Sequence, residues 1–236
     1  MTFIICKSSD PHWLDERRKR ITASDMNVWL GTQPSFYEET KATLVGRKLT
    51  GEDSVFNDRS LRRMAHGRER EQNALRMAGL MFGFPTAPYG YLIGNERWPY
   101  LAATLDGLLF PWVGREPYYS LTSQEGHMAE VRSIIEHAHA PVMCEVKVSD
   151  SGHRYKDRAD SPTAGQKAWI DYCPTYHFEQ VQTGLWMSGL EHALLVGCLG
   201  GDELICWYVP RQERWAETMD EVNGEAGEVL RPLWDK

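Results

Sequence analysis

The hydrophobic periodicity of the chain changes near Gly90, and this change limits the folds available to it. Before that point, apolar residues recur at intervals of three and four, which is typical of amphipathic helices. After it, runs such as "GYLIG" and "VMCEVKVS" are short, apolar or alternating, and separated by Gly, Asn and Pro, a pattern typical of strands. The chain is therefore expected to begin with helices and to continue into a β-sheet.

The expected elements follow the order α, β-β-β, α, β-β, α. Helices are predicted over 13–20, from a cap at Thr22 or Ser24 to Leu30, over 35–47, and over 59–79, where Gly79 ends the helix. Strands are predicted over 90–94, 100–110, 142–149, 192–200 and 202–210, the last two joined by a tight turn at Gly200-Gly201-Asp202. Further helices are predicted over 174–190 and 211–234.

The length of 236 residues is that of one large domain with its own core. We expect an α/β fold in which a central mixed β-sheet is flanked by helices. The expected parts of this single domain, 1–236, are a helical N-terminal region (1–80), a sheet core (85–210) with an insertion (111–141), and a C-terminal helix (211–236).

Charge and cysteine content narrow the class of protein. A net charge of −7 argues against a non-specific coat on nucleic acid, although basic residues gather at 16–20 and 59–70. Five cysteines without a Cys-x-x-Cys pair favour a reducing compartment over disulfides, zinc or an iron–sulfur cluster. No apolar run reaches membrane-spanning length and no leader is visible, so a cytoplasmic location is expected. His137 and His139 lack a third ligand at suitable spacing and are expected to be solvated.

The stretch "MCEVKVS" carries the first candidate for chemistry. Strand alternation places Cys144 and Val146 on one face and Glu145 and Lys147 on the other. Asp106, in "TLDGLL", stands at the end of another predicted strand. Two carboxylates and an ammonium around one point suit Mg²⁺, which prefers oxygen ligands, polarises phosphate and lowers the pKa of bound water. The pattern predicts hydrolysis of a phosphodiester, although by itself it is weak, and a solvated surface pair of Glu145 and Lys147 is its structural alternative.

Neighbouring motifs strengthen the interpretation. Glu71, in "HGREREQNAL", lies on a helix just before the sheet, where a third carboxylate can reach the same metal. Gln180, in "HFEQVQTGLWM", begins the helix expected to pack behind the strand of Glu145. The segment "RRKRITAS" offers guanidinium and hydroxyl groups near a helix start, which favours anions.

Taken together, "WLDERRKRITAS", "GREREQNA", "LDGLL", "CEVKVS" and "EQVQTGLW" resemble the lambda exonuclease and YqaJ-type viral recombinase nucleases of the PD-(D/E)xK superfamily. The resemblance implies a restriction-endonuclease-like core and an enzyme that digests one strand of linear duplex DNA from 5′ to 3′, leaving 3′ single-stranded tails for recombination. It also implies Mg²⁺, with Mn²⁺ as a substitute and two ions in the site, a ring-shaped homotrimer, a single-strand annealing protein as partner, and phage or prophage origin in a bacterial host.

The resemblance assigns roles residue by residue. Asp106 and Glu145 are expected as direct metal ligands with the Val146 carbonyl, and Glu71 at a second metal or a metal-bound water. Lys147 is expected to position the attacking water, with support from Gln180. Arg17, Ser24 and Thr104 fall where lambda-type enzymes hold the 5′-phosphate, and Trp13 where a ring stacks on terminal bases. Two positions depart from the family pattern: Leu105 replaces a proline and Thr104 replaces a serine.

Several alternatives stay open at this point. Glu69 and Arg70 compete with Glu71 for its place, Arg18 and Arg20 compete with Arg17, and Trp13 is equally a candidate core aromatic. His177 is a candidate phosphate contact or a partly buried helix residue. At the level of function, the rivals are another nuclease on the same fold, such as an endonuclease, a catalytically silent DNA-end-binding module, and a sugar-binding β-protein.

Overall fold

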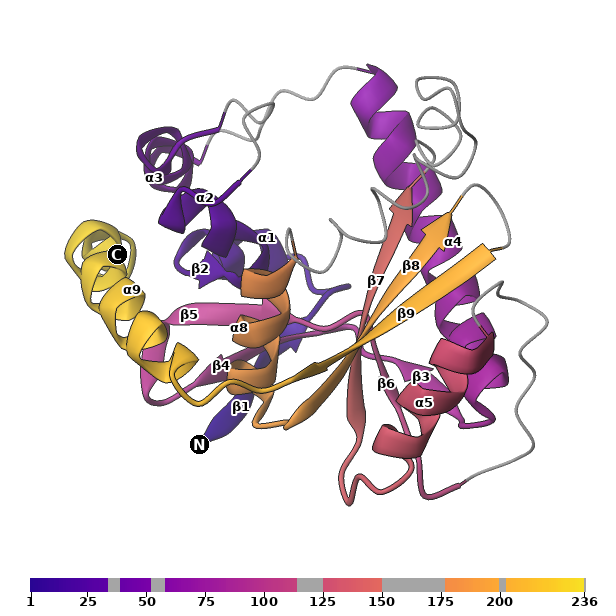
Figure 1. Ribbon diagram of the computed structural model, residues 1–236. Helices are drawn as coiled ribbons and strands as arrows, with labels where there is room; N and C mark the ends of the chain where they lie inside the picture. The colour runs from indigo at the N-terminus through magenta and orange to yellow at the C-terminus, as the bar shows by residue number, and fades with distance from the viewer. Residues whose placement is uncertain (34–38, 52–57, 114–124, 150–176, 200–202, 236) are drawn as a thin grey trace.

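The computed structural model describes residues 1–33, 39–51, 58–113, 125–149, 177–199 and 203–235 (Figure 1). Helical elements of the described part are α1 (Trp13–Arg18), η1 (Ala23–Asp25), α2 (Met26–Leu30), α3 (Lys41–Thr50), α4 (Asp58–Phe82), α5 (Glu125–Ile135), α8 (Phe178–Ser188), α9 (Trp215–Leu230) and η3 (Arg231–Leu233). Its strands are β1 (Thr2–Lys7), β2 (Ile21–Thr22), β3 (Thr86–Pro88), β4 (Tyr91–Asn95), β5 (Trp98–Thr104), β6 (Gly107–Leu109), β7 (Val142–Ser149), β8 (His192–Leu199) and β9 (Glu203–Pro210).

The strands form two mixed sheets. The four-stranded sheet has the order β1-β4-β5-β2, and the five-stranded sheet has the order β3-β6-β7-β8-β9. In the five-stranded sheet β7 and β8 run parallel, and every other neighbouring pair is antiparallel. The α/β class is confirmed, but the single central sheet is wrong, because the predicted strand 100–110 breaks at Leu105 and Asp106 and its two halves join different sheets.

Helices cover both sheets (Figure 1). α4 and α5 pack on one face of the five-stranded sheet, and their core includes Ala78, Phe82 and Met128. α8 contacts β7 and β8 but also β4, β5 and η1, so it joins the two sheets, while α9 packs against β5. The resulting second core includes Met143, from β7, and Leu185, from α8.

The sequence predicted a helical N-terminal region (1–80). The structure differs, because this region also contains the strands β1 and β2. β1 pairs with β4, and the two residues of β2 pair with β5. Both strands were missed because they are short and depend on partners distant in the chain, as was β3. The predicted cap is confirmed at Thr22, which begins η1 in a capping box with Asp25.

Helix boundaries differ from the predictions at several points. α4 continues past Gly79 to Phe82, and the helix ends before Gly83, whose φ of 68° is left-handed. α3 begins at Lys41 after a Thr40 cap instead of at residue 35. Predictions for 34–38 and for the Gly200-Gly201-Asp202 turn lie outside the described residues. The insertion contains α5, and its residues 114–124 also lie outside them. Among the helices that the structure describes, none has the length and apolar character needed to span a membrane.

Candidate active site

The strand β7 lies in the interior of the five-stranded sheet and presents its two faces to two different cores. Cys144 and Val146 pack into the core under α4 and α5, whereas Met143 packs into the core under α8. The alternation predicted for this strand is therefore confirmed. Its polar face is not a solvated surface: Glu145 is only 3% exposed, so the alternative of an exposed Glu145–Lys147 pair is wrong.

Asp106 occupies the point where the chain leaves the four-stranded sheet and enters the five-stranded sheet. Its carboxylate Oδ2 accepts a hydrogen bond from the Val146 amide at 2.8 Å, which ties it to β7 beside Glu145. The next residue, Gly107, has no room for a side chain, because a Cβ there would lie 2.4 Å from Cδ2 of Leu75 on α4. The sequence Asp-Gly thus lets α4 approach the sheet directly behind the carboxylate.

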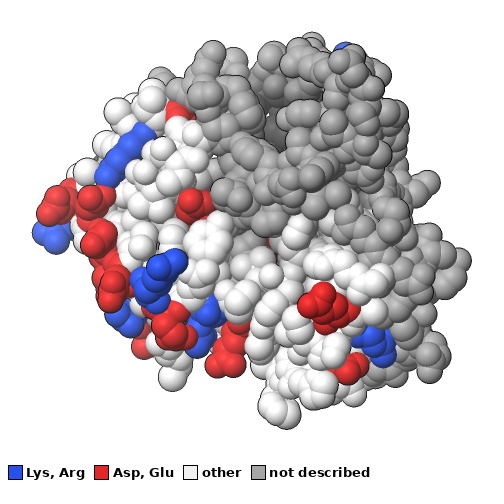
Figure 2. Space-filling view, in the orientation of Figure 1, with Lys and Arg blue, Asp and Glu red and all other residues white. Residues whose placement is uncertain are grey.

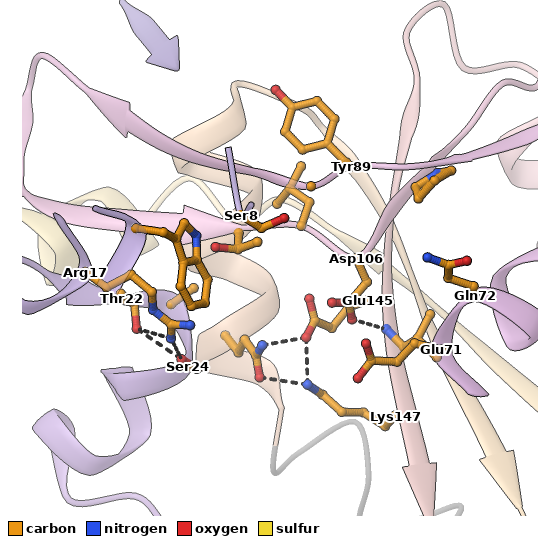
Figure 3. Close-up of a pocket in the computed structure, with 18 residues that line it drawn as sticks. Ser8, Arg17, Thr22, Ser24, Glu71, Gln72, Tyr89, Asp106, Glu145 and Lys147 are labelled. Atoms are coloured by element: carbon orange, nitrogen blue, oxygen red, sulfur yellow. Dashed lines mark hydrogen bonds and ion pairs between the residues drawn. The ribbon is translucent and has the colours of Figure 1, made fainter. Parts of the chain in front are cut away.

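Lys147 and Gln180 complete a small hydrogen-bonded network around Glu145 (Figure 3). The Lys147 ammonium donates to Oε1 of Glu145 at 2.6 Å and to Oε1 of Gln180 at 3.0 Å. The Gln180 amide donates to the same Glu145 oxygen at 2.5 Å. Gln180 lies in the first turn of α8, as expected, and so the helix that joins the two sheets also orients the lysine.

Burial raises the pKa values of both Glu145 and Asp106, and like charge adds to the effect at Glu145. Burial, the nearby Asp106 and, more weakly, Glu71 raise the pKa of Glu145 to about 7, against the opposing effect of Lys147. Burial also raises the pKa of Asp106, although Lys147 and the Val146 amide act in the other direction. The single ammonium of Lys147 does not compensate the carboxylates of the buried Glu145 and the half-buried Asp106, which is an environment that favours an additional cation.

The donor set fits a hard divalent cation. Within the described ranges, no three His, Cys, Asp or Glu side chains are grouped closely enough to form a metal site by themselves. Asp106, Glu145 and the backbone of Val146 nevertheless line one pocket together with Glu71. Mg²⁺ is commonly held by only one or two carboxylates and completes its shell with waters and substrate phosphate, so this oxygen-rich set suits it.

A second polar group, which we call the Arg17 cluster, consists of Arg17, Thr22 and Ser24. The Arg17 guanidinium donates to the Ser24 hydroxyl at 3.2 Å and to the Thr22 hydroxyl at 3.4 Å, and the two hydroxyls lie 3.0 Å apart. The guanidinium also stacks over the ring of Trp13, 4.5 Å from its centroid. The cluster therefore presents a guanidinium with its orientation fixed by an aromatic ring and two hydroxyls.

Both groups line the same pocket, which has a volume of about 480 Å³ (Figure 3). The pocket brings together every predicted site residue: Trp13, Arg17, Ser24, Glu71, Thr104, Asp106, Glu145, Val146, Lys147 and Gln180. In Figure 3 the Arg17 cluster lies on one side, and Glu71, Asp106, Glu145 and Lys147 lie on the other. The structure thus combines side chains that are far apart in the sequence into one candidate active site.

Competing residues at two positions point elsewhere. Arg18 donates to the Lys48 carbonyl, and Arg20 pairs with Glu16 at 2.6 Å and stacks on Trp234, so Arg17 is the arginine of that helix that faces the pocket. Glu71, rather than Glu69 or Arg70, lines the pocket. Trp13 also lines the pocket, where it supports Arg17, and it is not among the residues of the two buried cores.

The histidines singled out in the sequence are not among the pocket residues that could bind a metal ion. His137 and His139 are exposed near the end of α5, as expected. His177 lies at the N-terminus of α8, where burial and the nearby Lys147 lower its pKa to about 2. A neutral His177 offers no positive charge to a phosphate.

Sequence reasoning missed several residues that line the pocket, among them Ser8, Thr22, Gln72 and Tyr89. Thr22 had been considered as a helix cap and as one of the hydroxyl groups of "RRKRITAS", but it was not assigned to the site; its hydroxyl contacts Arg17 and Ser24. Its position inside "RITAS" was the available signal. The sequence contains no comparable signal for Ser8 and Tyr89, because their place in the pocket depends on the pairing of β1 with β4.

Part of the acidic charge lies on α9, none of whose residues lines this pocket. The exposed acidic residues of α9 are Glu217, Asp220, Glu221, Glu225 and Glu228. Figure 2 shows acidic side chains interspersed with basic ones over the region of α9. Among the residues that the structure describes, the pocket itself is lined by two basic side chains, Arg17 and Lys147, and by three acidic ones, Glu71, Asp106 and Glu145.

The two sheets with α4, and the Asp106, Glu145 and Lys147 arrangement between them, define a PD-(D/E)xK-type fold. A family model described as "YqaJ-like viral recombinase domain" matches residues 12–191. The chain belongs to this family. No curated protein sequence matches the chain.

Solved structures share the fold at low sequence identity. LHK-Exo in complex with dAMP has a TM-score of 0.57 and 16% identity, with 95% of this chain and 94% of that chain covered. The alkaline exonuclease LHK-Exo from Laribacter hongkongensis matches with the same TM-score and coverage at 15% identity. A phage-related exonuclease from Haemophilus somnus 129PT has a TM-score of 0.51 and 13% identity, with 92% and 95% covered.

Proposed function

We propose that this protein is a metal-dependent deoxyribonuclease that digests one strand of linear double-stranded DNA from its 5′ end, leaving 3′ single-stranded tails for phage-type recombination. The observation that carries the proposal is the single pocket that combines buried carboxylates and a lysine with an arginine and hydroxyls. The first group suits phosphodiester hydrolysis and the second suits binding of a terminal phosphate. Membership of a viral recombinase family and the fold shared with exonucleases support the same conclusion.

Asp106, Glu145 and the Val146 carbonyl would hold Mg²⁺, or Mn²⁺ in its place. Glu71, in the same pocket, would hold a second ion or a water bound to the first. When bound, the metal would supply charge neutralisation at the scissile phosphate and a more acidic water. The raised pKa values of Glu145 and Asp106 support this assignment, because a divalent cation favours the ionised carboxylates that burial disfavours.

Lys147 is assigned the task of orienting the attacking water and stabilising negative charge on the phosphate. Its ammonium donates to Glu145 and to Gln180. Those bonds fix the direction of the ammonium before substrate arrives, and preorganised charge is a major source of transition-state stabilisation. Gln180 acts as a positioning residue through both of its bonds.

Arg17, Ser24 and Thr104 are assigned to the 5′-phosphate of the digested strand. A guanidinium and hydroxyl donors are suited to a phosphate monoester, and their distance from the hydrolytic group along the pocket would set where the strand is cut. Trp13, beneath Arg17, is assigned to stacking on the terminal base. The ring homotrimer, the annealing partner and action in the bacterial cytoplasm are carried by the family resemblance and remain part of the proposal.

The decisive experiment compares digestion of three duplexes of the same sequence: one with 5′-phosphate ends, one with 5′-hydroxyl ends, and one closed into a circle. We expect Mg²⁺-dependent release of nucleotides from the phosphorylated ends first, slower release from hydroxyl ends, and none from the circle. Activity in EDTA would contradict the metal assignment. Nicking of the circle would favour an endonuclease, and binding without hydrolysis would favour a silent DNA-end-binding module.

A further inference from the structure

The side chain of Lys48, on α3, forms a buried ion pair beneath the Arg17 cluster. The Lys48 side chain is 6% exposed, and its ammonium lies 2.8 Å from Oδ2 of Asp25. Burying two charges is costly, and an ion pair of this kind contributes little net stability compared with apolar packing. The contacts of Lys48 indicate what else the pair does.

Lys48 is hydrogen-bonded to the main chain at and beside Arg17. Its ammonium donates to the Arg20 carbonyl at 2.8 Å and to the Arg17 carbonyl at 3.3 Å. The Arg17 carbonyl belongs to the last turn of α1, where a cation is electrostatically favoured, and the Arg20 carbonyl lies just beyond the helix. The backbone at both residues is therefore fixed by a side chain from another helix.

Asp25, the partner of Lys48, in turn fixes the hydroxyl of Thr22. Its Oδ2 accepts from the Thr22 amide at 2.9 Å and from the Thr22 hydroxyl at 2.7 Å. Because the Thr22 hydroxyl gives its only proton to Asp25, its oxygen is left to accept from Ser24 or Arg17. Thr22 thus acts as the acceptor that holds the two phosphate donors in place, and it does not itself donate to an anion.

Each member of the Lys48–Asp25 pair favours the charged form of the other. Burial alone would raise the pKa of Asp25, but Lys48 and the hydrogen bonds from Thr22 together hold that pKa below its usual value. Burial lowers the pKa of Lys48, and Asp25 opposes this effect. An ionised Asp25 is a pure acceptor, which is the state that the orientation of Thr22 requires.

We propose that Lys48 is a positioning residue for recognition of the 5′-terminal phosphate. Through the carbonyls of Arg17 and Arg20, and through Asp25 and Thr22, it fixes the donor geometry of the cluster without touching DNA. The inference rests on the proposed function, because it assumes that Arg17 and Ser24 bind that phosphate. It adds a residue that sets specificity for the end.

The test measures binding in EDTA, so that hydrolysis does not interfere. Fluorescence anisotropy compares two duplexes that differ only in a 5′-phosphate or a 5′-hydroxyl. We expect wild-type protein to prefer the phosphorylated end, and Lys48→Met to reduce that preference about tenfold, the effect of losing one charge-assisted hydrogen bond. Affinity for the hydroxyl end should stay within about twofold. Lys41→Met is the matched control: Lys41 lies on the same helix, is 44% exposed and pairs with Glu225.

If the wild-type protein prefers the phosphorylated end, two outcomes would overturn the role of Lys48 and leave the proposed function standing. One is an unchanged preference in Lys48→Met, and the other is an equal loss of affinity for both ends. If Lys48→Met does not fold, the double variant Asp25→Asn/Lys48→Met removes both buried charges. It should lose the same preference, because the bonds to the Arg17 and Arg20 carbonyls are still missing, and a retained preference would contradict the inference. A wild-type protein that binds both ends equally would overturn the proposed 5′-phosphate contact itself.

Discussion

The two sides of the pocket are built by different means. The carboxylate side, with Asp106, Glu145 and Lys147, is carried by strands in or beside the interior of a sheet, and Glu145 is 3% exposed. The Arg17 side is carried by a six-residue helix and a three-residue 3-10 helix, and Ser24 is exposed. Strand pairing fixes the first side, whereas a side-chain network through Asp25 and Lys48 fixes the second.

The difference indicates that each side of the pocket is held in a way that suits its proposed role. The carboxylates have to be close together in spite of their repulsion, and buried strands hold them there at the cost of raised pKa values. In the proposed function the arginine and hydroxyls bind an anion that enters from solvent, and they lie on accessible elements. Changes on the first side should therefore affect hydrolysis and stability, and changes on the second should affect the choice of DNA end.

The largest effect is expected from Lys147→Met, which removes the ammonium from the carboxylate side. Loss of a preorganised charge at the reacting centre should reduce the rate of digestion about 10²- to 10³-fold on both 5′-phosphate and 5′-hydroxyl ends. Binding to duplex in EDTA should keep its preference between the ends. Single-turnover digestion measures the rate, and Lys41→Met is the control. A rate close to that of wild-type protein would remove Lys147 from the catalytic group.

Packing behind the carboxylates is tested by Gly107→Ala. The new Cβ would lie 2.4 Å from Cδ2 of Leu75 and 3.0 Å from the Ala87 carbonyl oxygen, so the Leu75 side chain or α4 has to shift. We expect the free energy of unfolding to fall by about 2 kcal/mol, with a loss of digestion. Gly224→Ala on α9 is the control, since nothing lies within 4 Å of its Cβ, and it should be neutral or slightly stabilising. Equal denaturation midpoints for the two variants would contradict this account.

The pH dependence of stability tests the repulsion between the carboxylates. The pKa of Glu145 is about 7 in the folded protein, above the ordinary glutamate value of 4.5, so the folded state retains the proton between these two values. The free energy of unfolding should therefore fall as the pH rises from about 4.5 to about 7. Glu145→Gln should remove this loss and stabilise the metal-free protein at pH 8 by about 2 kcal/mol, with a smaller gain at pH 5.

The same variant separates stability from metal binding. Mg²⁺ should raise the melting temperature of wild-type protein at pH 8 and have little effect on Glu145→Gln, because ligand binding stabilises only a fold that retains its site. Thermal unfolding with Mg²⁺ and with EDTA provides the measurement. Glu221→Gln, at an exposed position of α9, is the control. An equal Mg²⁺ response in both variants would place the metal elsewhere.

The smallest effect is expected from Arg17→Met, on the other side of the pocket. The rate on 5′-phosphate ends should fall about tenfold, the effect of losing one charge-assisted contact, while the rate on 5′-hydroxyl ends should change little. Initial rates on the two duplexes give the ratio. Because Arg18 contacts the Lys48 carbonyl and does not line the pocket, Arg18→Met serves as the comparison, and an identical change in both variants would argue against a specific contact of Arg17.

Much of the site was accessible from the sequence, because its information is local. Period-two alternation is a property of a single strand, so it placed Glu145 and Lys147 on one side of β7 before any partner strand was known. The spacing of Gln180 within its helix and the order of the motifs predicted the set of residues that the pocket brings together. The change of period near Gly90 likewise predicted the α/β class.

What the sequence did not reveal depends on contacts between distant segments. The break at Leu105 and Asp106 follows from pairing with different partners, since Thr104 pairs with Leu92 and Gly107 pairs with Cys144. The interior position of β7 is set by β6 and β8, and that position buries Glu145 and raises its pKa. Local pattern contains no signal for such partners.

The sequence alone predicted many of the side chains that line the pocket, because residue type and strand alternation are local properties of the chain and its motifs resemble those of a known family. The tertiary structure alone decided their environment. It gave Glu145 a like-charged neighbour in a buried place, and it brought Lys48 from α3 to the end of α1. Burial and charge pairing arise only when segments far apart in the chain come together, and they determine both the protonation state of the carboxylates and the orientation of the arginine.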